Sequence, residues 1–196
     1  MLNSKINFKT LISFLSLAII ITSCGGNGDE PKTEEIKKDT VVVNHASCEA
    51  YYQDAKKMDD ILMKETSVKK DLAERAINAF NLYASECMND SLAPIFLLKA
   101  GQVAQSISNF KQAEILLKKC STDFPNFRNR GAALFLLAQL FDDAAMLNNE
   151  AEAKKIYEEI IKAYPNTAWA RDAKASIANL GKTDEQLIQE FLKKNK

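Results

Sequence analysis

Hydrophobic and polar residues follow each other along most of the chain with the spacing of amphipathic α-helices. The clearest stretch covers residues 153–166, AKKIYEEIIKAYPN. Its apolar residues return at steps of three and four, so they share one side of a helix, while lysines and glutamates take the other side. Pro165 cannot continue a helix, and we therefore expect this helix to end there.

A second copy of this pattern lies forty residues earlier, at residues 113–126, AEILLKKCSTDFPN. The following residues each precede a counterpart by 40 positions: Ala113, Leu116, Leu117, Cys120, Phe124, Pro125 and Asn126. An internal repeat of an amphipathic helix closed by an aromatic residue, proline and asparagine indicates a stack of similar helical units.

The same spacing predicts eight helices along the chain, including these two. Seven are expected at about 48–65, 68–88, 92–106, 110–123, 129–147, 150–164 and 168–179. The eighth opens at a capping box formed by Thr183 and Gln186, and we expect it to bury Leu187, Ile188, Phe191 and Leu192. The 129–147 helix is apolar on most sides, which predicts burial between neighbours.

Two of these helix pairs resemble tetratricopeptide repeats (TPRs). That family has a small residue midway in its first helix, an alanine early in the second, a large residue four positions later and a final proline. Gly101, Ala113, Leu117 and Pro125 fit this spacing in a repeat at about 94–127. Ala153, Tyr157 and Pro165 fit it in the next repeat, at about 134–167.

The second repeat departs from the family pattern in two ways. Phe141 replaces the small residue of its first helix, and the two copies are 40 residues apart, where the family usually has 34. The extra residues imply a longer first helix or a longer linker. The resemblance covers residues 68–192, and it implies an all-α, TPR-like solenoid of antiparallel helix pairs in residues 47–196.

The first 23 residues have the pattern of a secretion signal. Lys5 and Lys9 precede an apolar run at residues 11–21, which is shorter than the roughly 20 residues that a spanning helix needs. The run leads into ITSCGG, which resembles the lipobox of bacterial lipoproteins. That resemblance implies cleavage before Cys24 and acylation of Cys24, with residues 24–46 as a flexible tether. The alternative is an ordinary secretion signal with an unrelated cysteine.

Charge and motif content argue against several classes of function. Beyond residue 23 the chain has 24 basic and 26 acidic residues, a net charge of −2, which gives no electrostatic reason to expect binding to nucleic acid. The chain has a single histidine, His45, in the predicted tether, and no P-loop or G-x-S-x-G motif. We therefore expect no enzymatic activity, no cofactor and no metal site.

Three cysteines remain after Cys24. Cys48 begins the first predicted helix and Cys87 ends the second, so an antiparallel arrangement of these helices would bring the two thiols together. Two free thiols are the alternative to this disulfide. Cys120 stands where the repeat expects a small core residue, and we interpret it as part of the core.

The TPR resemblance implies binding of a protein or peptide partner in a groove lined by the first helix of each pair. Gln102, Gln105, Asp142 and Arg171 are the candidate groove residues, with plain solvent-exposed surface as the alternative for each. Ile95 and Leu98 are apolar candidates that could equally belong to the core.

The repeats look most like those of bacterial envelope TPR proteins, such as the lipoprotein of the outer-membrane assembly machine and the coordinator of the Tol-Pal system. This resemblance implies a lipid-anchored interaction scaffold for envelope assembly or maintenance, held by Cys24 at the outer membrane and facing the periplasm. One alternative is a surface-exposed lipoprotein that binds an external polymer or host molecule. The other is an enzyme that uses carboxylates alone.

Overall fold

The computed structural model of the protein describes residues 45–194. The predicted signal segment 1–23, the lipidation candidate Cys24 and nearly all of the predicted tether 24–46 lie outside these residues. Within the described residues, those from Ala46 onward form one compact unit.

All regular secondary structure in the described residues is helical, as the sequence predicts. The eight helices are α2 (His45–Leu62), α3 (Lys70–Glu86), α4 (Ala93–Ser106), α5 (Phe110–Asp123), α6 (Arg130–Asp142), α7 (Glu150–Ala163), α8 (Ala168–Asn179) and α9 (Asp184–Lys194). Helix α2 includes His45, so the predicted tether ends before this residue and not at residue 46. Among residues 45–194, no helix has the length and apolar character needed to cross a bilayer.

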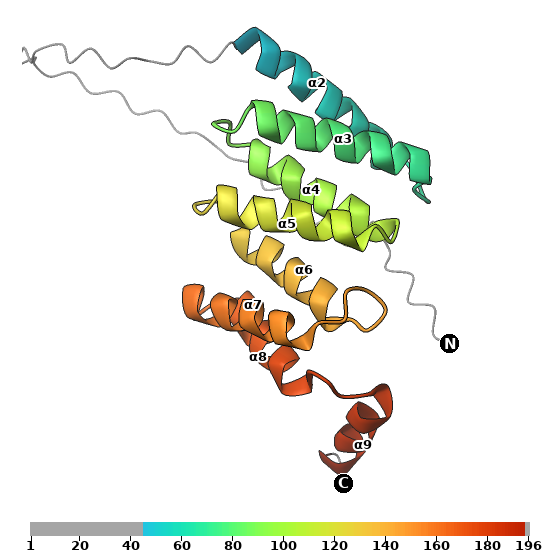
Figure 1. The fold of residues 1–196 in the computed structure, drawn as a ribbon, viewed down its shortest axis with the longest axis vertical. Helices are drawn as coiled ribbons and strands as arrows, with labels where there is room; N and C mark the ends of the chain where they lie inside the picture. The colour runs from blue at the N-terminus through green and yellow to red at the C-terminus, as the bar shows by residue number, and fades with distance from the viewer. Residues whose placement is uncertain (1–44, 195–196) are drawn as a thin grey trace, which may run out of the picture. The chain divides into compact units, whose positions relative to one another are not determined.

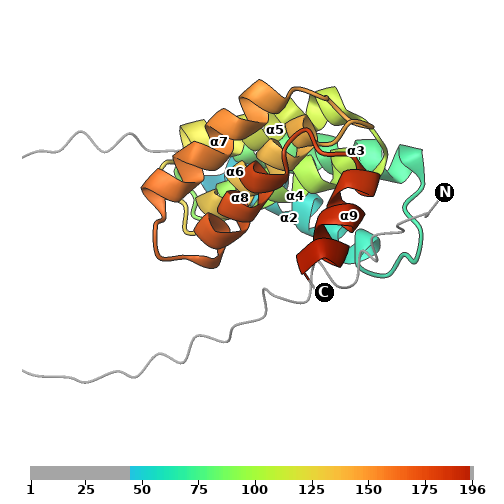
Figure 2. The same cartoon turned by 90° about the horizontal axis from the view of Figure 1, so that it is seen from below.

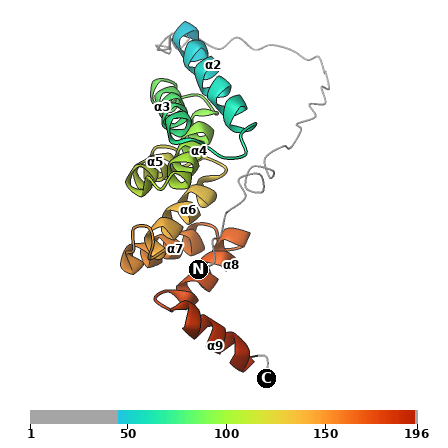
Figure 3. The same cartoon turned by 90° about the vertical axis from the view of Figure 1, so that its right-hand side faces the viewer.

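The helices stack in two layers. Helices α3, α5 and α7 form one layer, and α2, α4, α6 and α8 form the other (Figures 1, 2 and 3). From α3 to α8 each helix packs against the next one along the chain, and α6 also packs against α8. This is the helix-pair solenoid that the sequence predicts, and its all-α class is confirmed.

Small residues allow the helices of a pair to approach closely. A Cβ added at Gly101 of α4 would lie 2.7 Å from Cγ of Leu117 in α5, so only glycine fits there without movement of the leucine. Ala113 and Ala153, at equivalent positions of the two repeats, are both fully buried. The residues that carry the repeat pattern are therefore packing residues.

The predicted end of the 129–147 helix is wrong. Helix α6 ends at Asp142 and does not continue to 147, because Asp143 adopts an extended conformation and the chain turns back. The Leu147 amide donates a hydrogen bond to the Leu140 carbonyl at 2.9 Å, and the Asn149 amide donates one to the Phe141 carbonyl. The extra residues of the 40-residue period therefore lie in the linker 143–149.

Helix α9 also departs from expectation. Its capping box forms as predicted, with the Gln186 side chain accepting from the Thr183 amide at 3.0 Å and the Thr183 hydroxyl accepting from the Gln186 amide at 3.3 Å. The predicted burial of its apolar side is wrong, however, since Ile188, Phe191 and Leu192 are 57%, 66% and 51% exposed. Helix α9 extends beyond α8 and does not run back along it (Figures 1 and 3).

Candidate functional site

Helices α4 and α6 each leave one row of side chains partly or fully open to solvent. The α4 row consists of Ile95, Leu98, Lys99, Gln102 and Gln105, and the α6 row of Ala132, Phe135, Leu136, Gln139 and Asp142. Each α6 residue follows its α4 counterpart by 37 positions, so the two helices present equivalent rows. We call these ten residues the α4–α6 face.

Contacts with neighbouring elements hold the α4 row in place. The Lys99 ammonium forms an ion pair with Asp59 of α2 at 2.5 Å and lies 5.7 Å from the centre of the Phe96 ring. The Gln105 amide lies 3.7 Å from the sulfur of Met146, in the linker after α6. The α4 row is thus bordered by α2 on one side and by the 143–149 linker at its end.

An aromatic cluster supports the α6 row. The ring of Phe135 lies 5.6 Å, centre to centre, from Tyr157 of α7 and equally far from Trp169 of α8. The Trp169 indole packs over Gly131, where an added Cβ would lie 3.0 Å from the indole, and 38% of the tryptophan remains exposed. Trp169 therefore continues the aromatic surface from α6 onto α8.

Asp142 is partly exposed on the α4–α6 face and also forms a hydrogen bond with α7. The hydroxyl of Tyr157 donates to its carboxylate at 3.1 Å, and Tyr157 itself is fully buried. Burial raises the pKa of Asp142, and Asp143 and Glu150 add to the rise, although the tyrosine hydrogen bond lowers it. Burial likewise raises the pKa of Tyr157 to about 12. Asp142 thus links α6 to α7 in addition to lying on the α4–α6 face.

The four groove candidates do not all come together. Gln102, Gln105 and Asp142 lie on the α4–α6 face. Arg171 is exposed on a different side of α8 from Trp169, because their separation of two positions turns their side chains about 200° apart. Sequence reasoning missed Gln139, although its spacing of 37 residues from Gln102 could have revealed it.

The cysteines divide into a pair and a buried thiol. Cys48 and Cys87 form a disulfide with their Cα atoms 5.7 Å apart, which joins the first turn of α2 to the end of α3. Cys120 is buried in the core, and its thiol donates to the Pro94 carbonyl at 3.3 Å. Burial raises the pKa of Cys120 to about 12, so this thiol stays protonated and unreactive near neutral pH.

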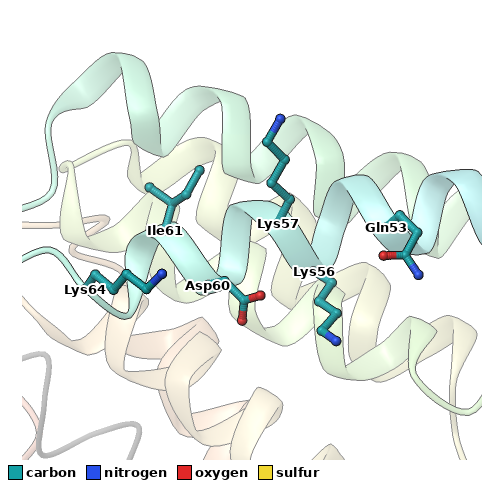
Figure 4. Close-up of a pocket in the computed structure, with 6 residues that line it drawn as sticks. All are labelled: Gln53, Lys56, Lys57, Asp60, Ile61 and Lys64. Atoms are coloured by element: carbon teal, nitrogen blue, oxygen red, sulfur yellow. The ribbon is translucent and has the colours of Figure 1, made fainter.

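A shallow hollow lies on the outer side of α2. It is lined by Gln53, Lys56, Lys57, Asp60, Ile61 and Lys64, and Figure 4 shows their side chains pointing in different directions along the helix. Three ammonium groups and one carboxylate that do not converge provide no catalytic arrangement. In the described part of the chain, no group of three or more His, Cys, Asp and Glu side chains is placed to hold a metal ion.

Comparison with known families identifies one of the helix pairs. The family model described as "Tetratricopeptide repeat" matches residues 132–167, which span most of α6, the 143–149 linker and all of α7. Residues 132–167 form a TPR. No curated protein and no solved structure matches the chain.

The TPR match confirms the repeat that the sequence predicts at about 134–167. In TPR terms α6 is the first helix of the repeat and α7 the second, so the α6 row lies on the first helix. Helices α4 and α5 have the same arrangement one step earlier in the stack. The two rows of the α4–α6 face are therefore equivalent surfaces of two successive helix pairs.

Proposed function

We propose that this chain is a scaffold that binds a protein or peptide partner on the α4–α6 face. The observation that carries the proposal is the pair of equivalent, solvent-accessible rows on a rigid stack that contains a TPR. TPRs commonly mediate binding to protein partners, and a repeated row suits a partner that extends across successive helices.

The chemistry of the face favours recognition by amide groups and apolar contact. Gln102 and Gln139 each offer an amide donor and acceptor, and Leu98 and Phe135 supply apolar surface beside them. The two charged residues of the face already have partners. Lys99 forms an ion pair with Asp59, and Asp142 accepts a hydrogen bond from Tyr157. An extended peptide with alternating apolar side chains and free backbone amides would satisfy this surface.

We further propose that the scaffold is attached to the cell envelope by a lipid on Cys24. The support is the sequence of residues 1–26, with its basic start, its short apolar run and its lipobox-like end. Several acyl chains on one residue meet the requirement of more than one signal for stable anchoring. The inferred location is the outer membrane, facing the periplasm, with a role in envelope assembly or maintenance.

A crosslinked pulldown from cells tests both parts of this proposal. The anchored protein should enrich envelope proteins, and the Cys24→Ala form should lose those that depend on placement at the membrane. The double variant Gln102→Arg/Gln139→Arg should lose the partner, because two bulky cations replace the amides. Ile115→Arg is the matched control, since Ile115 is 65% exposed on α5, in the other layer.

Two results would count against the proposal. Equal capture by the double variant and by Ile115→Arg would place the binding surface elsewhere. Capture of only secreted or extracellular molecules would exclude a periplasmic scaffold.

A further inference from the structure

The α4–α6 face repeats across the stack at the spacing of neighbouring helices. Leu98 of α4 and Phe135 of α6 occupy equivalent positions. The same holds for Gln102 of α4 and Gln139 of α6. Helices that lie side by side in one layer, as α4 and α6 do, are about 8–10 Å apart (Figures 1 and 3). An extended partner that meets both rows in the same way therefore presents like groups on one side at about this interval.

The interval distinguishes between the two extended conformations of a peptide. A β-strand returns to the same side every two residues, after about 6.5–7 Å, and next after about 13–14 Å. A polyproline II helix returns every three residues with a rise of about 3.1 Å per residue, which gives about 9 Å. Of the two, only polyproline II matches the spacing of the helices.

The aromatic residues of the face suit such a segment. The rings of Phe135 and Trp169 lie 5.6 Å apart, centre to centre, and 38% of the tryptophan is exposed. Contacts with Tyr157 and Gly131 hold the two rings in place before a partner arrives. Proline-rich segments in the polyproline II conformation dock on grooves lined by aromatic side chains. Helix α8 packs against α6, so Trp169 continues the repeated surface by one more helix.

The polar residues of the face complement the same conformation. A polyproline II segment makes no internal hydrogen bonds, so its carbonyl groups need donors from outside. Gln139 is exposed and Gln102 is partly exposed, and each side-chain amide can donate to such a carbonyl. Lys99 and Asp142 are already paired within the chain, so the face does not require a charged partner.

We propose that the partner of the α4–α6 face is a proline-rich segment in the polyproline II conformation. It crosses α4, α6 and α8 and places an apolar side chain at every third residue, against Leu98, Phe135 and Trp169 in turn. This inference rests on the proposed binding function of the face and names the class of partner that the face accepts.

Intrinsic fluorescence tests the inference directly, because Trp169 is the only tryptophan of the chain. The full chain with Cys24→Ala is titrated with three synthetic peptides of twelve residues. Four repeats of Leu-Pro-Pro favour polyproline II, four repeats of Leu-Gly-Gly keep the spacing of the leucines without that preference, and six repeats of Leu-Thr have the period of a strand. Leu-Pro-Pro should give a saturable change and bind at least about tenfold more tightly than the others, because it loses less conformational freedom on binding.

Matched variants locate the binding surface. Gln139→Arg should weaken binding of the Leu-Pro-Pro peptide at least about tenfold, because a bulky cation replaces an amide donor at the centre of the face. Ile115→Arg, on the other layer, should leave binding unchanged. Circular dichroism should show the same helix content in both variants and in the parent protein.

The outcomes separate this inference from the proposed function. Equal binding of the three peptides, or no saturable change with Leu-Pro-Pro, would overturn the inference. The proposed function would still stand if Gln102→Arg/Gln139→Arg loses its partner in the pulldown. Truncation of that captured partner should map its bound segment to a proline-rich stretch, and a bound segment without proline would also overturn the inference. Retention of the partner by the double variant would overturn both.

Discussion

Gly101 determines how closely α4 approaches α5. Its position allows no larger side chain, because an added Cβ would already lie 2.7 Å from Cγ of Leu117. Leu117 is itself fully buried and has little room to move. The same pair of residues was recognised in the sequence by TPR spacing, so the repeat pattern at this point reflects a steric requirement.

We expect Gly101→Val to lower the free energy of unfolding by about 1–3 kcal/mol, the usual cost of overpacking a core. Urea unfolding measures this loss. Ala50→Val is the control, because Ala50 is exposed on α2 and there the change carries only the small helix-propensity cost of a branched side chain. Equal losses in the two variants would contradict a steric role for Gly101.

The raised pKa of Asp142 predicts a pH dependence of stability. The folded chain holds the proton on Asp142 more tightly than the unfolded chain does, so stability falls as pH rises from the ordinary value of 3.8 through the raised folded value. Asp142→Asn retains an acceptor for Tyr157 and removes the charge. The variant should be at least as stable as the parent protein at pH 7.

Urea midpoints measured between pH 3 and 8 test this prediction. The difference between the Asn variant and the parent should shrink below about pH 3.8, where the aspartate becomes protonated in both states. Asp172→Asn, an exposed position on α8, serves as the control. A variant that is clearly less stable at pH 7 would show that the charged carboxylate is favourable, contrary to the expectation.

At the scale of elements, several specific links hold α2 to the stack, in addition to the burial of its Ala55 and Leu62 in the core. These are the Cys48–Cys87 disulfide, the ion pair of Asp59 with Lys99, and the Tyr52 ring, whose centre lies 6.0 Å from that of Tyr83 and 6.4 Å from that of Phe96. The disulfide joins residues 39 positions apart and connects the start of α2 to the end of α3, at the end of this helix pair that is away from the α2–α3 loop. It therefore restricts the unfolded chain as well as joining two helices.

We expect Cys48→Ala/Cys87→Ala to lower the free energy of unfolding by about 2–4 kcal/mol, as for other disulfides that close loops of this size. Hydrogen exchange should accelerate most in α2. Adding a reductant to the parent protein should have a similar effect and should leave the double variant unchanged. Thiol counting on the denatured Cys24→Ala chain should find one free thiol, Cys120, whereas three would contradict the disulfide.

Arg130 connects three helical segments from the first turn of α6. Its guanidinium donates to the Ser121 carbonyl of α5 at 2.7 Å, to Glu159 of α7 at 2.7 Å and to the Tyr164 hydroxyl at 3.4 Å. Nothing in the hydrophobic pattern pointed to this residue. Its role depends on three segments that meet only after the helices have stacked.

We expect Arg130→Lys to lower the free energy of unfolding by about 1–3 kcal/mol, because one ammonium cannot replace the forked geometry of three donors. Thermal or urea unfolding measures the change. Arg171→Lys provides the matched control, since Arg171 is exposed on α8. If both substitutions have the same small effect, Arg130 is not a link between the helices.

At the scale of the whole molecule, the two layers present the α4–α6 face as a preformed surface. Its charged members are already paired, and the chain beyond residue 23 is close to neutral. We therefore expect the affinity for the partner to change by less than about threefold between 50 and 300 mM salt. Binding titrations of the captured partner across this range of salt concentration would measure the affinity. A steep fall of the affinity with salt would indicate that the partner binds a charged surface elsewhere.

The sequence alone predicts most of the fold. The start and end of α5 and α8 agree with the spacing of apolar residues and with the residues that cap them, and the TPR was located to within two residues at its start. These features are local, because helix formation, capping and termination by proline depend on neighbouring residues. The early end of α6 was missed because the linker 143–149 folds back on that helix through contacts that no local pattern encodes.

The candidate site was only partly predictable, for the same reason. Spacing along one helix groups Gln102 with Gln105, and both lie on the α4–α6 face. It cannot show which side of α8 faces α6, and Arg171 lies on a different side of α8 from Trp169. The composition and the periodicity of this chain therefore determine an all-α stack with a TPR. Only the tertiary structure decides which rows of side chains remain open, because exposure depends on how neighbouring helices cover one another.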